Sequence, residues 1–245
     1  MLHLKYWRKS LNKYDLVYKI EEFAPLNTQE KWDCSGWGVE YTSTRPTGEG
    51  LGVRGQEISR VLFALTVTDK IVQQAREKNC DMIISHHPLF YIPFDWKDIN
   101  IYCAHTNLDK AENGTTDRLI KELGFTKTES FEFVRIVKLQ KSITVEELRQ
   151  KLLKISPKLR YINNYDKTTI QTIGFCAGSG SEFINEYKTD AFVTGDLKFH
   201  TALDTKNVVF DIGHFESEQF APKILKEITG IGEEGIIADE KSPFI

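Results

Sequence analysis

The positions of hydrophobic and polar residues along this chain predict alternating strands and helices. Residues 59–66 contain an apolar run typical of a buried strand, and residues 82–84 form a second one. Between them, Thr68 can cap a helix in which Ile71 and Val72 lie on one face. A strand, a helix and a strand in this order indicate a βαβ unit and therefore a parallel sheet.

A second series of the same kind follows in the later half of the chain. Its predicted strands are at residues 134–139, 159–162, 172–177, 191–194 and 208–212, and its predicted helices are near 144–153, 197–203 and 219–228. The first series also includes a predicted strand at 101–104 and predicted helices near 14–23 and 119–123. A polar, lysine-rich stretch at 126–130 separates the two series. The sequence thus predicts an α/β protein of two linked α/β domains, residues 1–128 and residues 129–245.

Two neighbouring histidines end the apolar run at 82–84. Adjacent side chains on a strand point to opposite faces, so His86 and His87 can converge only where the strand has ended and the backbone turns. Pro88 favours such a turn because it biases His87 away from the helical conformation. The alternative is a pair of partly exposed histidines with no shared site.

Polar side chains follow several of the other predicted strands as well. In open α/β sheets, ligands bind outside the carboxyl ends of the strands. The candidates at these ends are His86, His87, His105, Asp109, Asp196, His200, Asp211, His214, Glu216 and Glu218. Pro222 must lie in the first turn of the last predicted helix, which leaves open whether His214 and Glu218, four residues apart, share one helical turn.

This mixture of imidazoles and carboxylates suits a divalent zinc, manganese, iron or nickel ion. A catalytic zinc takes about three protein ligands, so the chain offers more candidates than one ion needs. Two ions would share a bridging carboxylate, and the spacing alone leaves open which one it is. The alternative is a set of histidines that complete hydrogen bonds in the core. For Asp196 and Asp211, roles as loop caps and turn formers are favoured over ligation.

Composition narrows the class of protein. With 40% apolar residues the chain can bury a real core, and its net charge of −3 gives no basic surface for nucleic acid. No apolar run is long enough to cross a membrane, and the first residues do not resemble a secretory signal. The cysteines form no CxxC motif and are typical of reduced thiols, so the expected location is cytoplasmic.

Four sequence blocks carry a resemblance to a known family. They are Ser-His-His-Pro-Leu-Phe at 85–90, Ala-His-Thr-Asn-Leu-Asp at 104–109, Thr-Gly-Asp-Leu-Lys-Phe-His at 194–200 and Gly-His-Phe-Glu-Ser-Glu at 213–218. Together with Glu-Glu-Phe-Ala-Pro-Leu at 21–26, they resemble the NIF-three-like family, whose members are often labelled GTP cyclohydrolase 1 type 2 homologues. The resemblance runs from about Asp15 over nearly the whole chain.

The resemblance implies a dinuclear metal centre between the two α/β domains and a ring-shaped homohexamer built as a trimer of dimers. The implied ligands of the two divalent ions are His87 and Asp109 for one, His86 and His214 for the other, and Glu218 as the bridge. Glu216 would not be a ligand. His105 and His200 would line the pocket, and both are candidates for proton transfer during catalysis.

The implied function is that of a metal-dependent hydrolase of GTP cyclohydrolase 1 type 2 kind, acting on a nucleotide or similar small molecule. The alternative is a metal-binding regulatory or metal-handling protein, chaperone-like, without turnover. Nucleic-acid binding through the central hole of a ring is disfavoured by the acidic net charge. The chain departs from the family pattern at Cys34, where an asparagine is usual, in a longer loop at 42–55 and in an N-terminal arm containing Tyr6, Trp7 and Arg8.

Overall fold

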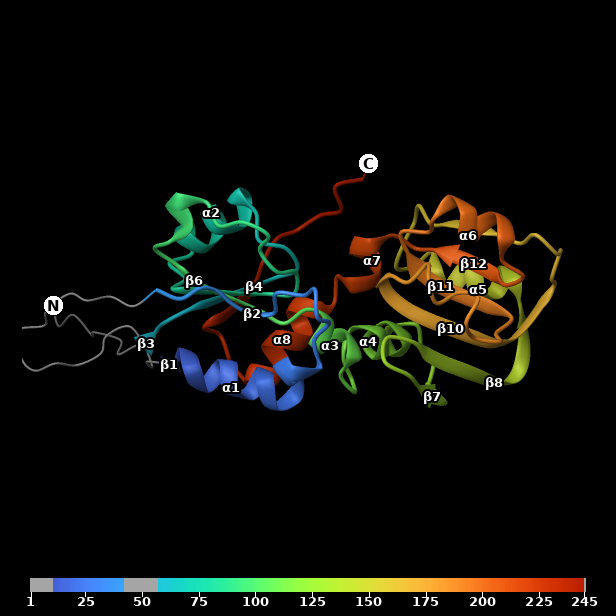
Figure 1. Ribbon diagram of the computed structural model, residues 1–245, viewed down its shortest axis with the longest axis horizontal. Coiled ribbons are helices and arrows are strands. Elements are labelled where there is room, and N and C mark those ends of the chain that lie inside the picture. The colour runs from blue at the N-terminus through green and yellow to red at the C-terminus, as the bar shows by residue number, and fades with distance from the viewer. Residues whose placement is uncertain (1–10, 42–56, 245) are drawn as a thin grey trace, which may run out of the picture. The chain divides into compact units, whose positions relative to one another are not determined.

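The structure is a computed structural model that describes residues 11–41 and 57–244. These residues form two compact units, each built around its own sheet (Figure 1). The first unit takes in residues up to 108 together with residues 222–240, and the second takes in residues 109–221 and those from 241 on. The expected α/β class is confirmed. The N-terminal arm and the loop at 42–55 lie outside the described residues.

The first unit contains a five-stranded sheet in the order β13-β4-β5-β6-β2 and a two-stranded sheet of β1 and β3. Its strands are β1 (Leu11–Asn12), β2 (Gly36–Val39), β3 (Glu57–Ile58), β4 (Val61–Ala64), β5 (Met82–Ser85), β6 (Asn100–Cys103) and β13 (Gly235–Ile237). Its helices are α1 (Lys13–Phe23), η1 (Leu26–Thr28), α2 (Asp69–Glu77), η2 (Phe94–Trp96) and α8 (Ala221–Thr229). The helix α3 (Thr106–Lys110) spans the division after residue 108.

Helices cover both faces of the five-stranded sheet, which explains why its central strands β4 and β5 are buried throughout and almost entirely apolar. Leu62 and Ile83 pack with the apolar face of α2, which lies on one side of the sheet in Figure 1. Alternate residues such as Phe63 point to the opposite side, where α1 and α8 lie. On that side the Tyr102 hydroxyl donates a hydrogen bond to Glu21 of α1 at 2.9 Å.

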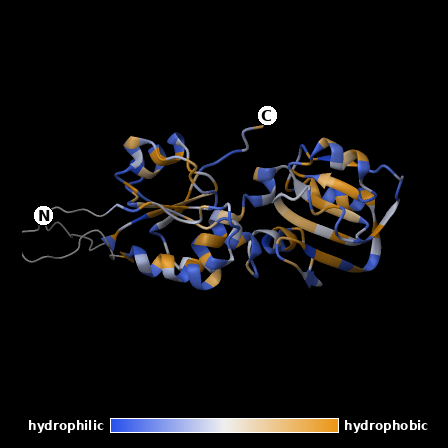
Figure 2. Cartoon of the chain, viewed as in Figure 1, coloured by the Kyte–Doolittle hydropathy of each residue, from blue (hydrophilic) through white to orange (hydrophobic). Residues whose placement is uncertain are grey.

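The second unit contains a six-stranded mixed sheet in the order β7-β8-β10-β11-β12-β9, in which β10, β11 and β12 are parallel. Its strands are β7 (Glu129–Ser130), β8 (Arg135–Thr144), β9 (Arg160–Ile162), β10 (Thr169–Ser179), β11 (Ala191–Gly195) and β12 (Val208–Asp211). Its helices are α4 (Thr115–Glu122), α5 (Val145–Leu152), α6 (Phe199–Asp204) and α7 (His214–Glu218). Figure 2 shows hydrophobic residues concentrated on the strands of both large sheets.

Local sequence signals account for the helix boundaries. The Thr68 side chain accepts a hydrogen bond from the Ile71 amide at the start of α2, as expected. Thr144 and Glu147 form the expected capping box of α5. Pro222 lies in the first turn of α8, where its missing N–H costs no helical hydrogen bond.

The division of the chain differs from the expected one, which placed the boundary at residue 128 and the whole C-terminal part in the second domain. In the structure, α4 packs its buried face into the core of the second unit, beside Leu148 and Leu152. The segment after residue 221 returns to the first unit, where β13 pairs in parallel with β4. Strand pairing over so long a sequence separation leaves no trace in local periodicity, and the prediction contained neither β13 nor β2.

No helix among the described residues is both long enough and apolar enough to cross a membrane.

Arg135 organises one end of the second unit from a position that is only 1% exposed. Its guanidinium donates to the Asp117 carboxylate at 3.1 Å and to the carbonyls of Lys110 and Ala111, each at 3.1 Å. Removing the guanidinium therefore takes away several buried hydrogen bonds at once and a cationic partner of Asp117, which is costly in a low-dielectric interior.

We expect Arg135→Met to lower the free energy of unfolding by about 3–5 kcal/mol. Urea unfolding followed by circular dichroism measures this loss. Arg149→Met is the matched control, because Arg149 pairs with Glu146 at a partly exposed site and its loss should cost at most about 1 kcal/mol. Equal losses in the two variants would show that the buried hydrogen bonds of Arg135 contribute little.

Candidate metal centre

The end of β5 delivers two histidines to one place because strand pairing continues briefly beyond the strand. The His86 amide donates to the Ala64 carbonyl at 3.1 Å, and the His87 amide donates to the Leu65 carbonyl at 2.8 Å. The backbone then turns into Pro88, as expected, and the two imidazole centroids lie 5.0 Å apart. The two rings therefore converge although their residues are adjacent in the chain.

His105 joins this pair from the end of β6. Its ring centroid lies 5.2 Å from that of His86 and 5.6 Å from that of His87. One ring nitrogen from each of the three residues can be chosen so that all lie within 4.8 Å of one another, which is close enough to hold a metal ion. We call this group, His86, His87 and His105, the three-histidine cluster.

Each ring of the three-histidine cluster is oriented by a hydrogen bond at Nδ1. The partners are the Ala104 carbonyl for His86 at 2.9 Å, the Thr66 hydroxyl for His87 at 2.6 Å and the Asp33 carboxylate for His105 at 2.9 Å. A carbonyl or carboxylate can only accept, so His86 and His105 carry their proton on Nδ1 and keep the lone pair of Nε2 for a metal ion or a proton.

Thr66 is itself held from the far end of the chain. The Glu240 carboxylate accepts hydrogen bonds from the backbone amides of Leu65 at 2.6 Å and Thr66 at 3.0 Å. Burial raises the pKa of Glu240, although these two amide donors oppose the shift. The position of the Thr66 hydroxyl beside His87 therefore depends on a residue in the last segment of the first unit.

Asp33 is a residue that sequence reasoning did not single out. Besides His105, its carboxylate accepts hydrogen bonds from the Thr106 amide at 3.1 Å and from the Ser35 hydroxyl at 2.9 Å. Burial opposes ionisation, but these hydrogen bonds and the His105 ring hold the pKa of Asp33 well below its usual range. The signal that could have identified Asp33 is its place in Trp32-Asp33-Cys34, next to the unusual Cys34.

The second unit contains a separate group of candidate metal ligands on α7. This helix makes His214 and Glu218 neighbours on one turn, and the His214 Nε2 atom lies 3.0 Å from a Glu218 carboxylate oxygen. The Nδ1 atom of the same ring contacts the Asp196 carboxylate at 2.6 Å. The ring is thus held between two carboxylates.

In the group around His214, the burial and the negative charge of the carboxylates favour the presence of a cation. Burial alone would lower the pKa of His214, but its hydrogen bonds to Glu218 and Asp196 and their negative charges raise that pKa to about 10. Glu218 is only 3% exposed, and one of its oxygens lies within 4.8 Å of a carboxylate oxygen of Asp109. The Thr115 hydroxyl donates to Asp109 at 2.5 Å and orients it. Two buried carboxylates this close require a proton or a metal ion near them.

Asp196 lies in the bend after β11, and Asp211 is the last residue of β12. Asp196 has a φ of 51°, a left-handed conformation that aspartate tolerates better than most residues. Asp211 accepts a hydrogen bond from the Gly213 amide at 3.1 Å and forms an ion pair with Arg160. Asp196 has a further role that was not expected, since it orients His214.

The other expected residues lie outside these groups. His200 is exposed on α6, with its ring against Phe199 at a centroid distance of 5.6 Å. Within the described part of the chain, neither His200 nor Glu216 belongs to a group of residues that could hold a metal ion. The assignment of individual ligands to ions, and of His105 and His200 to proton transfer, remains a prediction.

Gly178, at the end of β10, leaves the space that the Glu218 side chain occupies. It has a φ of +68°, and a Cβ atom there would lie 2.2 Å from a Glu218 carboxylate oxygen. Its amide also donates to the Ser217 hydroxyl at 2.9 Å, which ties β10 to α7.

We expect Gly178→Ala to displace the Glu218 carboxylate and to weaken divalent-ion binding by about 10-fold or more. Titration with Co²⁺ in competition with a chelator measures the affinity. Gly124→Ala is the control, because Gly124 also has a positive φ, of +76°, but has nothing within 4 Å of the added Cβ. Backbone strain is then similar in both variants, and an equal loss of affinity would argue against the displacement.

Comparison with known proteins places the chain among relatives of the same length and fold. A family model described as Duf34/NIF3 (NGG1p interacting factor 3) matches residues 11–233. A "GTP cyclohydrolase 1 type 2 homolog" of Clostridium perfringens is 30% identical over 269 aligned positions, covering 94% of this chain and 97% of the relative. A protein of the same name from Clostridium acetobutylicum is 31% identical over 244 positions, covering 85% and 86%.

The fold is also found among solved structures. One described as "Structural genomics, protein ybgI, unknown function" superposes with a TM-score of 0.80 over 95% of this chain and all of the other. At 20% sequence identity, this likeness supports the fold alone. The family match supports more, because it covers most of the sequence and confirms the resemblance of the four histidine-bearing blocks. The chain belongs to the Duf34/NIF3 family.

Proposed function

We propose that this protein is a dinuclear metal-dependent hydrolase of GTP cyclohydrolase 1 type 2 kind, acting on a nucleotide or similar small molecule. The observation that carries the proposal is the hydrogen bond at Nδ1 of His86, His87, His105 and His214. An imidazole fixed in this way through an oxygen is the usual arrangement of a metal-ligating histidine. The names of the Clostridium relatives support the choice of reaction.

In this proposal, the three-histidine cluster and the buried carboxylates of the second unit supply ligands to the same pair of divalent ions. The ligands are those the resemblance implies: His87 and Asp109, His86 and His214, and Glu218 as the bridge. The donor set fits, because imidazole nitrogens mixed with carboxylate oxygens suit zinc, manganese, iron or nickel. Two carboxylates also offset part of the charge of two dications.

When held by these ligands, divalent ions would supply an activated water and would polarise the bond that is attacked. His105 then accepts or returns a proton at Nε2, because Asp33 holds its other nitrogen protonated. Asp33 also fixes the orientation of the His105 ring, as the aspartate of a catalytic triad does for its histidine. His200 is the second candidate for proton transfer, on the basis of the resemblance.

The first test is metal content. We expect about two divalent ions per chain in protein purified without a chelator, measured by elemental analysis. Glu218→Gln should lower the content of both ions because it removes the bridging charge, whereas Glu216→Gln should leave it unchanged. Less than one ion per chain, not restored by added metal, would refute the dinuclear centre.

The second test is turnover. Metal-loaded protein is incubated with a panel of nucleotides, and the products are identified by mass spectrometry. We expect His105→Ala to lower the rate by about 10²-fold at unchanged metal content. Loss of metal that excess metal restores would instead make His105 a ligand or an orienting residue. Bound ions without any turnover would favour the alternative, a regulatory or metal-handling protein.

The assembly and the location of the protein stand as parts of the same proposal. The resemblance implies a homohexamer built as a trimer of dimers, with a small molecule as the substrate. The widely spaced cysteines and the ordinary composition are typical of a cytoplasmic protein.

A further inference from the structure

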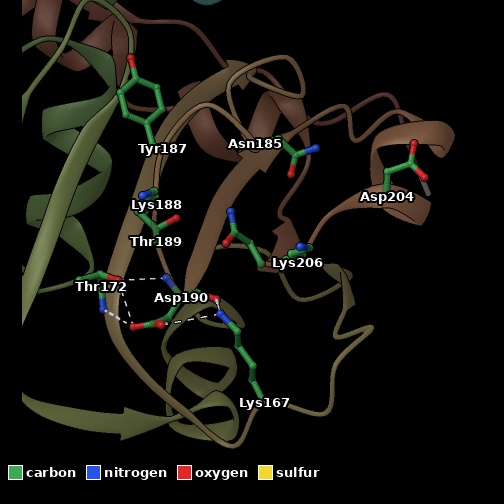
Figure 3. A pocket seen from close by; sticks show the side chains of 10 residues that line it. Lys167, Thr172, Asn185, Tyr187, Lys188, Thr189, Asp190, Asp204 and Lys206 are labelled. Carbon is green, nitrogen blue, oxygen red and sulfur yellow. Dashed lines mark hydrogen bonds and ion pairs between the residues drawn. The ribbon is translucent and has the colours of Figure 1, made fainter.

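The second unit contains a pocket of about 500 Å³ that the proposed function does not use (Figure 3). Most of its lining residues carry a polar or charged group, and they come from the segments that precede β10, β11 and β12 and from the start of β10. The lining residues that bear on its chemistry are Lys167, Asn185, Lys188, Thr189, Asp204 and Lys206. A volume of this size suits a small metabolite.

The pocket lies at the end of the sheet opposite to the candidate metal ligands of the same unit. Asp190 and Asn207 directly precede β11 and β12, whereas Asp196 and His214 follow the carboxyl ends of these strands. Each strand has four or five residues. At about 3.3 Å per residue, the two ends are roughly 15 Å apart, so a small ligand in the pocket would not reach the α7 group.

Two positive charges of the pocket are not neutralised. Lys167 lies beside the Asp190 carboxylate at 3.7 Å and donates to the Asp190 carbonyl at 3.3 Å, as Figure 3 shows. Lys188 and Lys206, by contrast, form no ion pair or side-chain hydrogen bond with the rest of residues 11–41 and 57–244. Both are exposed, and both ammonium groups are available to an anion.

A buried hydroxyl adds a second, independent observation. Thr189 is 7% exposed, lines the pocket, and its Oγ1 atom has no hydrogen-bond partner among the described residues. In Figure 3 this hydroxyl points toward the side of the pocket on which Lys206 lies. An unsatisfied buried hydroxyl is destabilising, and although the Oγ1 atom is covered in the free protein, rotation of this short side chain about χ1 would bring it to a ligand at the base of the pocket.

We propose that this pocket binds a small phosphate ester that also carries hydroxyl groups, such as a sugar phosphate. Lys188 and Lys206 would hold the phosphate, since an ammonium group is a strong point-charge partner of phosphate. Thr189, Asn185 and Asp204 would bind hydroxyls of the ester. The carboxylate of Asp204 at the rim disfavours a ligand that is anionic throughout, and the net charge of −3 disfavours a nucleic acid.

Calorimetric titration of the full chain with ribose 5-phosphate tests the proposal, with ribose and inorganic phosphate as the reference ligands. We expect saturable binding with a Kd of about 1 mM or below, at least about 10-fold tighter than for either reference ligand. The double variant Lys188→Gln/Lys206→Gln should weaken binding by about 10-fold or more. The control variant Lys141→Gln/Lys158→Gln has the same net charge and should bind like the parent chain.

Thr189→Val tests the hydroxyl separately. Because the hydroxyl has no partner in the free protein, the variant should unfold at a urea concentration no lower than the parent, yet bind ribose 5-phosphate about 5-fold or more weakly. Three outcomes would overturn the proposal. They are no saturable binding of ribose 5-phosphate, equal affinity for ribose, and equal affinity in the Lys188/Lys206 variant and its control.

Discussion

The hydrogen bond at Nδ1 of each candidate histidine is the constraint on which this site depends. An imidazole free to rotate about its side-chain torsions would present either nitrogen in many directions. Here the acceptor oxygens of Asp33, Ala104 and Asp196 and the hydroxyl of Thr66 restrict each ring to one orientation. These four partners differ in chemistry and come from different segments. What they share is a place just after a strand end or in a turn beside one, so the sheets determine the geometry of the rings.

Backbone hydrogen bonds also hold the residues that follow the strands of the first unit in place. Pairing between β4, β5 and β6 does not stop at the last strand residues, because the amides of His86, His87 and Ala104 still donate to carbonyls of the neighbouring segment. The residues that carry the chemistry are therefore held almost as firmly as strand residues, although they lie where the chain has begun to turn. In the second unit, α7 achieves the same result by a different route, since one helical turn places His214 and Glu218 side by side.

The sequence predicted those features of the fold and the site that depend on residues close together in the chain, and it did not predict those that depend on distant segments. Thr68, Thr144 and Pro222 act within a few residues, and the helix starts that they predict are confirmed. The histidines at strand ends could be found for the same reason. The pairing of β13 with β4 and the hydrogen bond that His105 donates to Asp33 join segments far apart in the chain, and no local periodicity records them. The pocket around Thr189 was missed because its residues are ordinary turn residues whose proximity only the fold creates.

The hydrogen bonds that Glu240 accepts from the amides of Leu65 and Thr66 have a consequence for the order of folding during synthesis. They join residues 175 and 174 positions apart, and the Thr66 hydroxyl in turn orients His87. During synthesis, residues 109–221 must emerge before the segment that completes the first unit. Until β13 has been synthesised, the edge of β4 that pairs with it is unpaired. An unpaired strand edge can bind a chaperone or pair wrongly with another segment. The ring of His87 acquires its final support among the last events of folding, so the orientation of the three-histidine cluster is complete only after residue 240 has been synthesised.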